Sequence, residues 1–508
     1  MGAAKKIKDL FCGAQETRTG TLVSVAVGAL SKPVGYLRTL LLAWLFGASA
    51  GMDAVYTAMG ILLLICQIVQ SVAESALLPR LIRQPEGKAS ALMACVSRRT
   101  FFCAAVLAIT VCLFPASAVR FFARKFDAER LNLSAKMLVL FLPWALSLIV
   151  QVLMGVWNNH RGRYSLSISL GAVGYALMIP MIWASSGILG VFSVAAVYSL
   201  ASSVLAAIIW RVTGDFPLKG AAEAGQLRGF ASDCLLCVGI VGAVSLNQLV
   251  DRYFASGMAA GNISAISYAG LIYTLPQSIL SPAMMIYLNR ASRAAGNSET
   301  SRSLLEPVLS MSWLYVFPLS LFLACLASPV VTVFLGYGAF DAAAVALTAP
   351  CMTAAAWALP FMLWSQIFSR YAQACGQLKK ILAVSYGALA ANVALDWALA
   401  PRWGAPGLCA ATGVALSVSA LTYARLLARG SLGRVACAVW RPSVIFALCM
   451  AATVGLCGRG LAALMVGAAV TALYYLAGER LGFFAAVPPA WRPLNLLKLL
   501  PEKIGALR

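Results

Sequence analysis

Lys32 and Arg38 are two cations in an otherwise apolar stretch long enough to cross a membrane, SKPVGYLRTLLLAWLFGASAGMDAVYTA at residues 31–58. An ammonium or guanidinium group at membrane depth costs at least about 2.5 kcal/mol. We expect both side chains to face a protein cavity, because facing lipid would cost more. Two interpretations stay open: binding of an anionic substrate, or internal pairing with Glu74, Asp53 or a carbonyl oxygen.

A second group of polar residues in apolar stretches carries oxygen atoms. Asn392 and Asp396 are four residues apart and share one helix face. Thr412 and Asp251 lie at corresponding depths of two other stretches. Carboxylate, amide and hydroxyl oxygens are the ligands that a small hard cation prefers. The alternative is a hydrogen-bonded polar cluster, with Asp251 pairing only with its neighbour Arg252.

The elements that must position these residues are membrane-spanning helices. The chain has 508 residues, is 61% hydrophobic and 11% charged, and its mean hydropathy is +0.85, which no soluble globular protein shows. Apolar stretches of this length span a bilayer, and in lipid they must be helical. We predict an all-α polytopic membrane protein with about fourteen transmembrane helices. The spans lie at about 20–46, 54–80, 100–122, 137–158, 165–186, 188–211, 229–254, 264–288, 308–335, 344–370, 379–401, 405–429, 435–457 and 459–480.

The net charge of +22 reports orientation rather than nucleic-acid binding. With the N-terminus in the cytoplasm, 29 of the 39 Lys and Arg residues fall in cytoplasmic ends and loops, and 7 fall in outer loops. This asymmetry predicts that both termini are cytoplasmic. Attraction to anionic membrane lipids is a secondary effect of the same charge. We expect no nucleic-acid partner.

The sequence repeats weakly at an offset of about 215 residues, with an even number of spans between the copies. Such repeats are related by a pseudo-twofold axis along the membrane normal. The predicted organisation is two six-helix lobes, a cytoplasmic linker between them, and two further helices with a basic tail. Their boundaries are 1–211, 212–228, 229–430 and 431–508. Two lobes around a central cavity are typical of an alternating-access transporter, and no catalytic constellation indicates an enzyme.

The order and spacing of several short motifs resemble the MurJ (MviN) family of the multidrug/oligosaccharidyl-lipid/polysaccharide exporter superfamily. The family opening, Ser-Arg-x-x-Gly-x-x-Arg-Asp, then Phe-Gly and Asp-Ala, has counterparts along the first two spans. Later motifs match around the eighth span and in the turn YGAFD. The matching positions are Ser31, Lys32, Gly35, Arg38, Phe46, Gly47, Asp53, Ala54, 264–269, 275–296 and 337–341.

This resemblance implies a lipid II flippase of the bacterial cytoplasmic (inner) membrane, which moves the undecaprenyl-diphosphate-linked peptidoglycan precursor. Lys32, Arg38 and Asp53 match the family's substrate-site residues. The resemblance also implies a sodium site and no other cofactor. Its ligands would be Asp251, Asn392, Asp396, Thr412 and the backbone carbonyl of Leu408.

The chain also departs from the family pattern. The family's aspartate is Thr39, no Lys or Arg occurs between Arg38 and Arg80, and Gly270 follows Tyr-Ala where the family has an arginine. A less basic cavity keeps open the export of another undecaprenyl-linked glycan, such as an O-antigen or capsule unit. A cation-coupled drug antiporter is disfavoured, because its cavity should be acidic. The sequence does not predict which exact glycan is carried or the oligomeric state of the protein.

Overall fold

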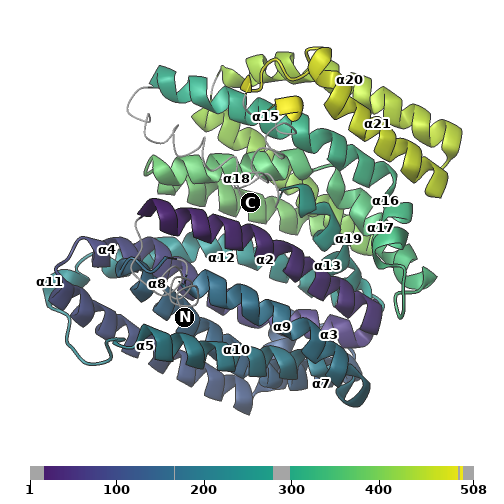
Figure 1. The fold of residues 1–508 in the computed structure, drawn as a ribbon. Helices are drawn as coiled ribbons and strands as arrows, with labels where there is room; N and C mark the ends of the chain where they lie inside the picture. Colours follow the sequence, from purple (N-terminus) through teal and green to yellow (C-terminus); the bar gives the residue numbers. More distant parts are fainter. Residues whose placement is uncertain (1–16, 165, 278–297, 429, 490–491, 496–508) are drawn as a thin grey trace, which may run out of the picture. The chain divides into compact units, whose positions relative to one another are not determined.

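The computed structural model describes residues 17–164, 166–277, 298–428, 430–489 and 492–495, and within these residues the chain is helical and contains no strand (Figure 1). The helices of the first half are α2 (Thr17–Phe46), α3 (Ala50–Val72), the π-helical turn η1 (Ala73–Leu77), α4 (Leu78–Ile82), α5 (Glu86–Leu113), α6 (Pro115–Phe122), α7 (Ala128–Leu140), α8 (Leu142–His160), α9 (Leu166–Leu189), α10 (Phe192–Thr213) and α11 (Ala224–Leu227). Those of the second half are α12 (Phe230–Ala255), α13 (Asn262–Tyr273), α15 (Ser298–Cys325), α16 (Ala327–Leu335), α17 (Ala342–Ala356), α18 (Leu359–Ala374), α19 (Leu378–Leu427), α20 (Ser431–Cys457) and α21 (Leu461–Arg480).

A helix lies at every predicted span, although residues 278–288 of the eighth span fall outside the described residues. Nine helices of the described ranges are long and apolar enough to cross a membrane, or eleven if each of two bent pairs counts as one span. The helix α19 has 50 residues and covers two predicted spans, which its backbone break at Gly404 (φ 61°, ψ −140°) separates. The predicted all-α membrane fold is therefore confirmed.

Several predicted spans are broken helices, and the breaks recur along the chain. α7 and α8 meet at a bend of 40°, and α17 and α18 at a bend of 54°. α8 and α18 both begin with Leu-Pro, and proline, which lacks an N–H, is tolerated at the first turn of a helix. The two starts, Leu142 and Leu359, are 217 residues apart. This separation agrees with the repeat offset seen in the sequence.

The chain forms two compact units. The first contains the residues up to Ser264 together with Gly338–Phe340, and the second contains Ala265–Tyr337 and the chain from Asp341 onward. The first unit thus includes α12, which the repeat pattern assigns to the second lobe. Compactness does not test repeat symmetry, so the predicted lobe boundaries stay predictions.

Within the first unit, α2 lies along α9, and α10 packs on both α8 and α9 (Figure 1). The turn at Gly338–Phe340 is anchored on the end of α2, where the Ala339 N–H donates to the Trp44 carbonyl at 2.8 Å. Gly47 has φ +60°, and a Cβ there would lie 2.3 Å from the Ala339 carbonyl oxygen, so only glycine fits. Two motifs nearly 300 residues apart in the sequence are therefore one packing contact.

The predicted linker 212–228 is tied to α4 and α5. Arg98 Nη2 donates to the Gly220 carbonyl at 2.7 Å, and Lys88 pairs with Glu223 at 3.3 Å. Arg80 donates to the carbonyls of Gln226 and Arg228. The linker thus contributes its backbone carbonyls, and α4 and α5 supply cations that bind them.

Candidate substrate and cation sites

Arg38 is held between two aromatic rings from neighbouring helices. Its guanidinium Cζ lies 5.0 Å from the centroid of the Tyr175 ring on α9 and 4.9 Å from that of Tyr198 on α10. Its Nη1 contacts the Met178 sulfur at 3.8 Å. Each cation–π contact contributes about 0.5–2 kcal/mol, depending on desolvation. The rings stabilise the charge of the guanidinium without neutralising it.

No carboxylate of the described residues forms an ion pair with Arg38. Its Nε is buried and has no hydrogen-bond partner there. Buried guanidinium nitrogens are normally hydrogen-bonded, because an unpaired one costs free energy. The arrangement is thus a positioned cation with donor capacity left over, which suits an anionic ligand.

Lys32 lies on the same helix but on a different face. Its side chain is exposed, and a spacing of six residues places it about 9 Å from Arg38 along the axis and about 120° around it. The two predicted cations therefore differ: Arg38 is fixed, and Lys32 is on a long flexible stem.

Asp53 is buried and caps the first turn of α13. Its carboxylate accepts hydrogen bonds from the Gly261 N–H, the Ser264 N–H and the Ser264 hydroxyl, each at 2.7 Å. A carboxylate at a helix N-terminus satisfies N–H groups that the helix leaves unpaired. This geometry favours a structural role, while the prediction that Asp53 contacts substrate stays a prediction.

Arg130 secures the loop that precedes the same turn. Its guanidinium bonds the Asp127 carboxylate at 2.8 Å and the Met258 carbonyl at 3.1 Å. The Arg130 backbone N–H, together with its guanidinium, holds the pKa of the Asp127 carboxyl below its usual range. Asp53, Arg130 and their partners therefore join α3, α7 and the start of α13 into one polar assembly.

Arg252 is a third cation within a predicted span, on α12. Its guanidinium lies directly against the backbone of Gly60 on α3, in the space that a side chain at this position would fill. α3 and α12 pack together in the first unit. Arg252 was not among the predicted site residues. Its contact with Gly60 depends on the packing of α12 on α3, which are far apart in the sequence.

The predicted cation ligands of the second unit lie on the two arms of α19. Asn392 and Asp396 precede the break at Gly404 and are fully buried, and Asn392 Nδ2 donates to Asp396 Oδ2 at 2.9 Å. Leu408, which is buried, and Thr412 follow the break. The donation through Nδ2 turns the Asn392 amide oxygen away from that carboxylate oxygen.

A hydrogen bond joins the two arms of α19. The Tyr423 hydroxyl donates to the Ile381 carbonyl at 3.4 Å, so the far ends of the two arms meet and the arms run roughly antiparallel. Asn392 and Asp396 lie on the first arm, and Leu408 and Thr412 lie on the second. Because 392 and 396, like 408 and 412, are four residues apart, each pair shares a helix face.

The fit to a sodium ion rests on this oxygen set. Carboxylate, amide, hydroxyl and backbone carbonyl oxygens suit a hard cation. In the described part of the chain, no three His, Cys, Asp or Glu side chains lie close enough together to hold a metal ion. The predicted set has only two carboxylates, so this absence does not exclude it. Asp251 belongs to the first unit. The sodium site stays a prediction.

The sequence of the whole chain decides the family. The family model described as lipid II flippase MurJ matches residues 42–479. The chain belongs to the lipid II flippase MurJ family. The predicted family is thereby confirmed, as are a transporter rather than an enzyme and a multi-pass protein of the inner membrane.

Individual MurJ relatives are distant in sequence. The probable lipid II flippase MurJ of Thermotoga maritima is 23% identical over 397 residues, which cover 76% of this chain and 80% of that protein. The lipid II flippase MurJ of Burkholderia cenocepacia is 24% identical over 419 residues, covering 77% and 80%. The similarity therefore extends over most of both chains.

Solved structures show the same fold. A lipid II flippase MurJ in an inward closed conformation superimposes with a TM-score of 0.76 at 18% identity, covering 90% of this chain and 99% of that one. An inward-facing multidrug resistance transporter of the MATE family gives a TM-score of 0.66 at 14% identity, covering 82% and 98%. The fold is thus that of MurJ and its wider superfamily.

The sequence patterns did not predict the two tyrosine rings that contact Arg38. Tyr175 and Tyr198 follow Arg38 by 137 and 160 residues, so no local spacing signals their contact. Thr39, where the family has aspartate, donates its hydroxyl to the Gly35 carbonyl at 3.1 Å within α2. The departure therefore replaces a carboxylate beside Arg38 with a side chain that bonds its own helix.

Proposed function

We propose that this protein is a flippase that moves lipid II from the inner to the outer leaflet of the cytoplasmic membrane by alternating access, with both termini in the cytoplasm. The observation that carries the proposal is Arg38, a cation without a carboxylate partner among the described residues, on a helix of a MurJ-family chain. A diphosphate is the anionic part of lipid II, and such a cation suits it.

Arg38 would bind the diphosphate through its planar fork of N–H donors. Guanidinium and phosphate form paired, charge-assisted hydrogen bonds. Tyr175 and Tyr198 lie against the guanidinium and restrict its motion, which lowers the ordering cost of binding. Lys32 would approach as a second, movable charge. The prenyl chain would remain in the lipid during transfer.

Sodium coupling is part of this proposal. Asn392, Asp396, Thr412 and the carbonyl of Leu408 would hold the ion, with Asp251 as a further ligand. The ion would supply positive charge next to a carboxylate that is buried in the second unit. Coupling requires that the two conformations of the transporter bind sodium with different affinities.

One observation favours a second cargo, another undecaprenyl-linked glycan. No Lys or Arg lies between Arg38 and Arg80, and Gly270 stands where the family has arginine. Fewer cations around the diphosphate would weaken selection at that group and leave recognition to the glycan. Both cargoes share the diphosphate, so the Arg38 interaction is common to them.

Complementation tests the function. A host depleted of its own lipid II flippase should regain growth with this chain, and Arg38→Ala should abolish the rescue. Loss of charged hydrogen bonds of about 1.5–3 kcal/mol weakens lipid II binding about ten- to hundredfold. Arg38→Lys keeps the charge without the fork and should rescue only partly.

Immunoblots of membranes must show equal amounts of each variant. Full rescue by Arg38→Ala at normal abundance would remove Arg38 from the substrate site. Failure of the abundant wild-type chain to rescue lipid II transport, combined with rescue of an O-antigen or capsule flippase mutant, would assign the second cargo instead.

A further inference from the structure

A cavity of about 710 Å³ opens between α6, α7 and the start of α10, away from Arg38. Its wall is mostly apolar, with Pro115, Leu131 and Phe192 among the lining residues. The polar side chains that line it are Arg120, Asn132 and Lys136. The volume lies within the range of about 300–1,000 Å³ typical of small-molecule sites.

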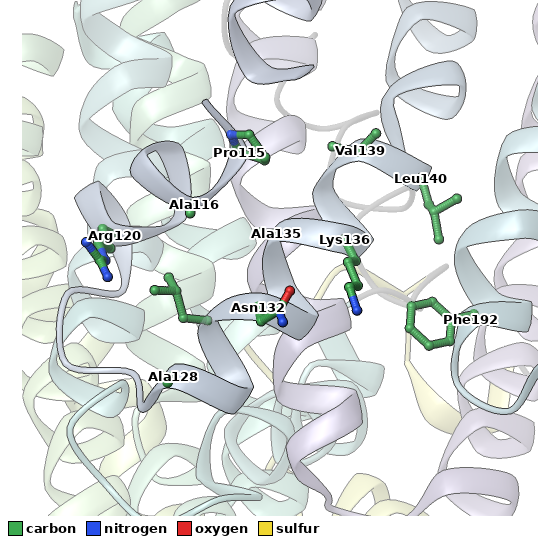
Figure 2. Close-up of a pocket in the computed structure, with 11 residues that line it drawn as sticks. Pro115, Ala116, Arg120, Ala128, Asn132, Ala135, Lys136, Val139, Leu140 and Phe192 are labelled. Carbon is green, nitrogen blue, oxygen red and sulfur yellow. The ribbon is translucent and has the colours of Figure 1, made fainter. Parts of the chain in front are cut away.

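The three polar side chains line different parts of this space. Asn132 and Lys136 lie on successive turns of α7, with Phe192 across from Lys136 and Arg120 at the other end of the cavity (Figure 2). Residues four apart on a helix share one face. An anionic group beside Lys136 would therefore meet a cation and an amide, and Arg120 adds a second cation to the cavity wall.

These polar groups have no partners in the described part of the chain. Arg120 and Lys136 are exposed and take part in none of its ion pairs. The nearest carboxylates along α7 do not compensate, because Asp127 pairs with Arg130 and Glu129 does not line the cavity. The site therefore keeps a net positive charge.

The surroundings are those of a lipid-facing surface. Leu113, Phe114 and Phe121, on and beside α6, expose 66%, 60% and 78% of their surfaces. An apolar exposed belt next to a cationic cavity matches the two ends of a phospholipid, an acyl chain and a phosphate. A soluble anion would leave the apolar wall without a partner.

We propose that this cavity binds an anionic phospholipid, with its phosphate at Asn132 and Lys136, its headgroup extending toward Arg120 and an acyl chain on the apolar wall. In the orientation proposed above, the lipid belongs to the outer leaflet. This site is separate from the lipid II site in residues and in function. Its occupant would be a resident membrane lipid that stabilises the α6–α7 region.

Native mass spectrometry of the full chain in detergent, titrated with dioleoyl phosphatidylglycerol, tests the proposal. A cation near a lipid surface contributes about 1 kcal/mol, so Lys136→Gln should weaken binding about fivefold and the double variant Arg120→Gln/Lys136→Gln about thirtyfold. The matched control is Arg124→Gln, which removes one exposed charge of the same outer loop without lining the cavity. It should bind as the wild type does.

Two further arms identify the ligand. Ala116→Trp fills the cavity without changing charge and should weaken binding at unchanged melting temperature. Dioleoyl phosphatidylcholine, which has the same acyl chains, should bind more weakly than phosphatidylglycerol. Equal loss in Arg124→Gln or equal binding of the two lipids would overturn the proposal. Stronger competition by undecaprenyl phosphate would overturn it too, because it would assign the cavity to the path of the prenyl substrate.

Discussion

At the scale of single residues, the decisive feature is the environment of Arg38. A guanidinium between two tyrosine rings stays charged. None of the ion pairs among the described residues includes Arg38, so its charge is available to an external anion. Thr39 removes the carboxylate that would stand beside it. In the proposed function, one fixed arginine would thus carry much of the recognition of the diphosphate.

Tyr175 tests whether the rings contribute to substrate binding. Its side chain is 39% exposed, so its replacement should cost little stability, whereas Tyr198 is buried in a wider aromatic cluster. Tyr175→Leu should weaken lipid II binding about two- to fivefold, since a cation–π contact of about 0.5–1 kcal/mol is lost. Tyr175→Phe keeps the ring and should bind normally when lipid II is titrated into each variant and followed by native mass spectrometry. Equal effects of both variants would implicate the hydroxyl instead.

At the scale of elements, helix ends and breaks set the geometry. The break at Gly404 folds α19 into two roughly antiparallel arms, which the bond from Tyr423 to Ile381 joins. Gly407 packs on the Leu399 carbonyl, where a Cβ would lie 2.6 Å away. At the start of α13, Asp53 accepts hydrogen bonds from N–H groups that the helix leaves unpaired.

The cap at α13 predicts a loss of stability. Asp53→Ala removes three hydrogen bonds to a charged acceptor, and the unfolding free energy should fall by about 2–4 kcal/mol. Ser264→Ala removes only the hydroxyl bond and should cost about 1 kcal/mol. The double variant should cost less than the sum, because the two residues share an interaction.

Melting temperatures of the purified variants measure these effects. Ser264→Ala should leave lipid II binding unchanged, since the hydroxyl acts only on the cap. Additive losses in the double variant would show that Asp53 and Ser264 stabilise the protein independently, contrary to the bonding that the structure shows.

At the scale of the whole molecule, the chain comprises two compact units, and alternating access would be a change in their relation. A ligand shifts such an equilibrium only if the two states bind it with different affinity. The proposed sodium site tests this requirement through stability, because an ion that binds the folded protein alone raises the free energy of unfolding.

Sodium should raise the melting temperature relative to potassium at equal ionic strength. At a concentration one hundred times its dissociation constant, a bound ion contributes about 2.7 kcal/mol. Asp396→Asn should abolish the difference between the two salts. Asp127→Asn, which removes a carboxylate outside the predicted set, should preserve it. A sodium effect that persists in Asp396→Asn would exclude this site.

The sequence by itself determined the membrane class, the positions of the helices along the described residues and the family. Hydropathy is a local property of about twenty residues, and the bilayer forces such stretches into helices. It also singled out Arg38, Asn392 and Asp396, because a polar side chain in an apolar span is conspicuous.

Tertiary structure alone decided what surrounds those residues. The rings that hold Arg38, the backbone groups that bond Asp53 and the cavity between Arg120 and Lys136 come from helices that meet only after packing. Helix packing depends on the shapes of whole surfaces, and local spacing contains no record of them. A charge in a membrane helix is therefore visible in the sequence, while its partner is a property of the fold.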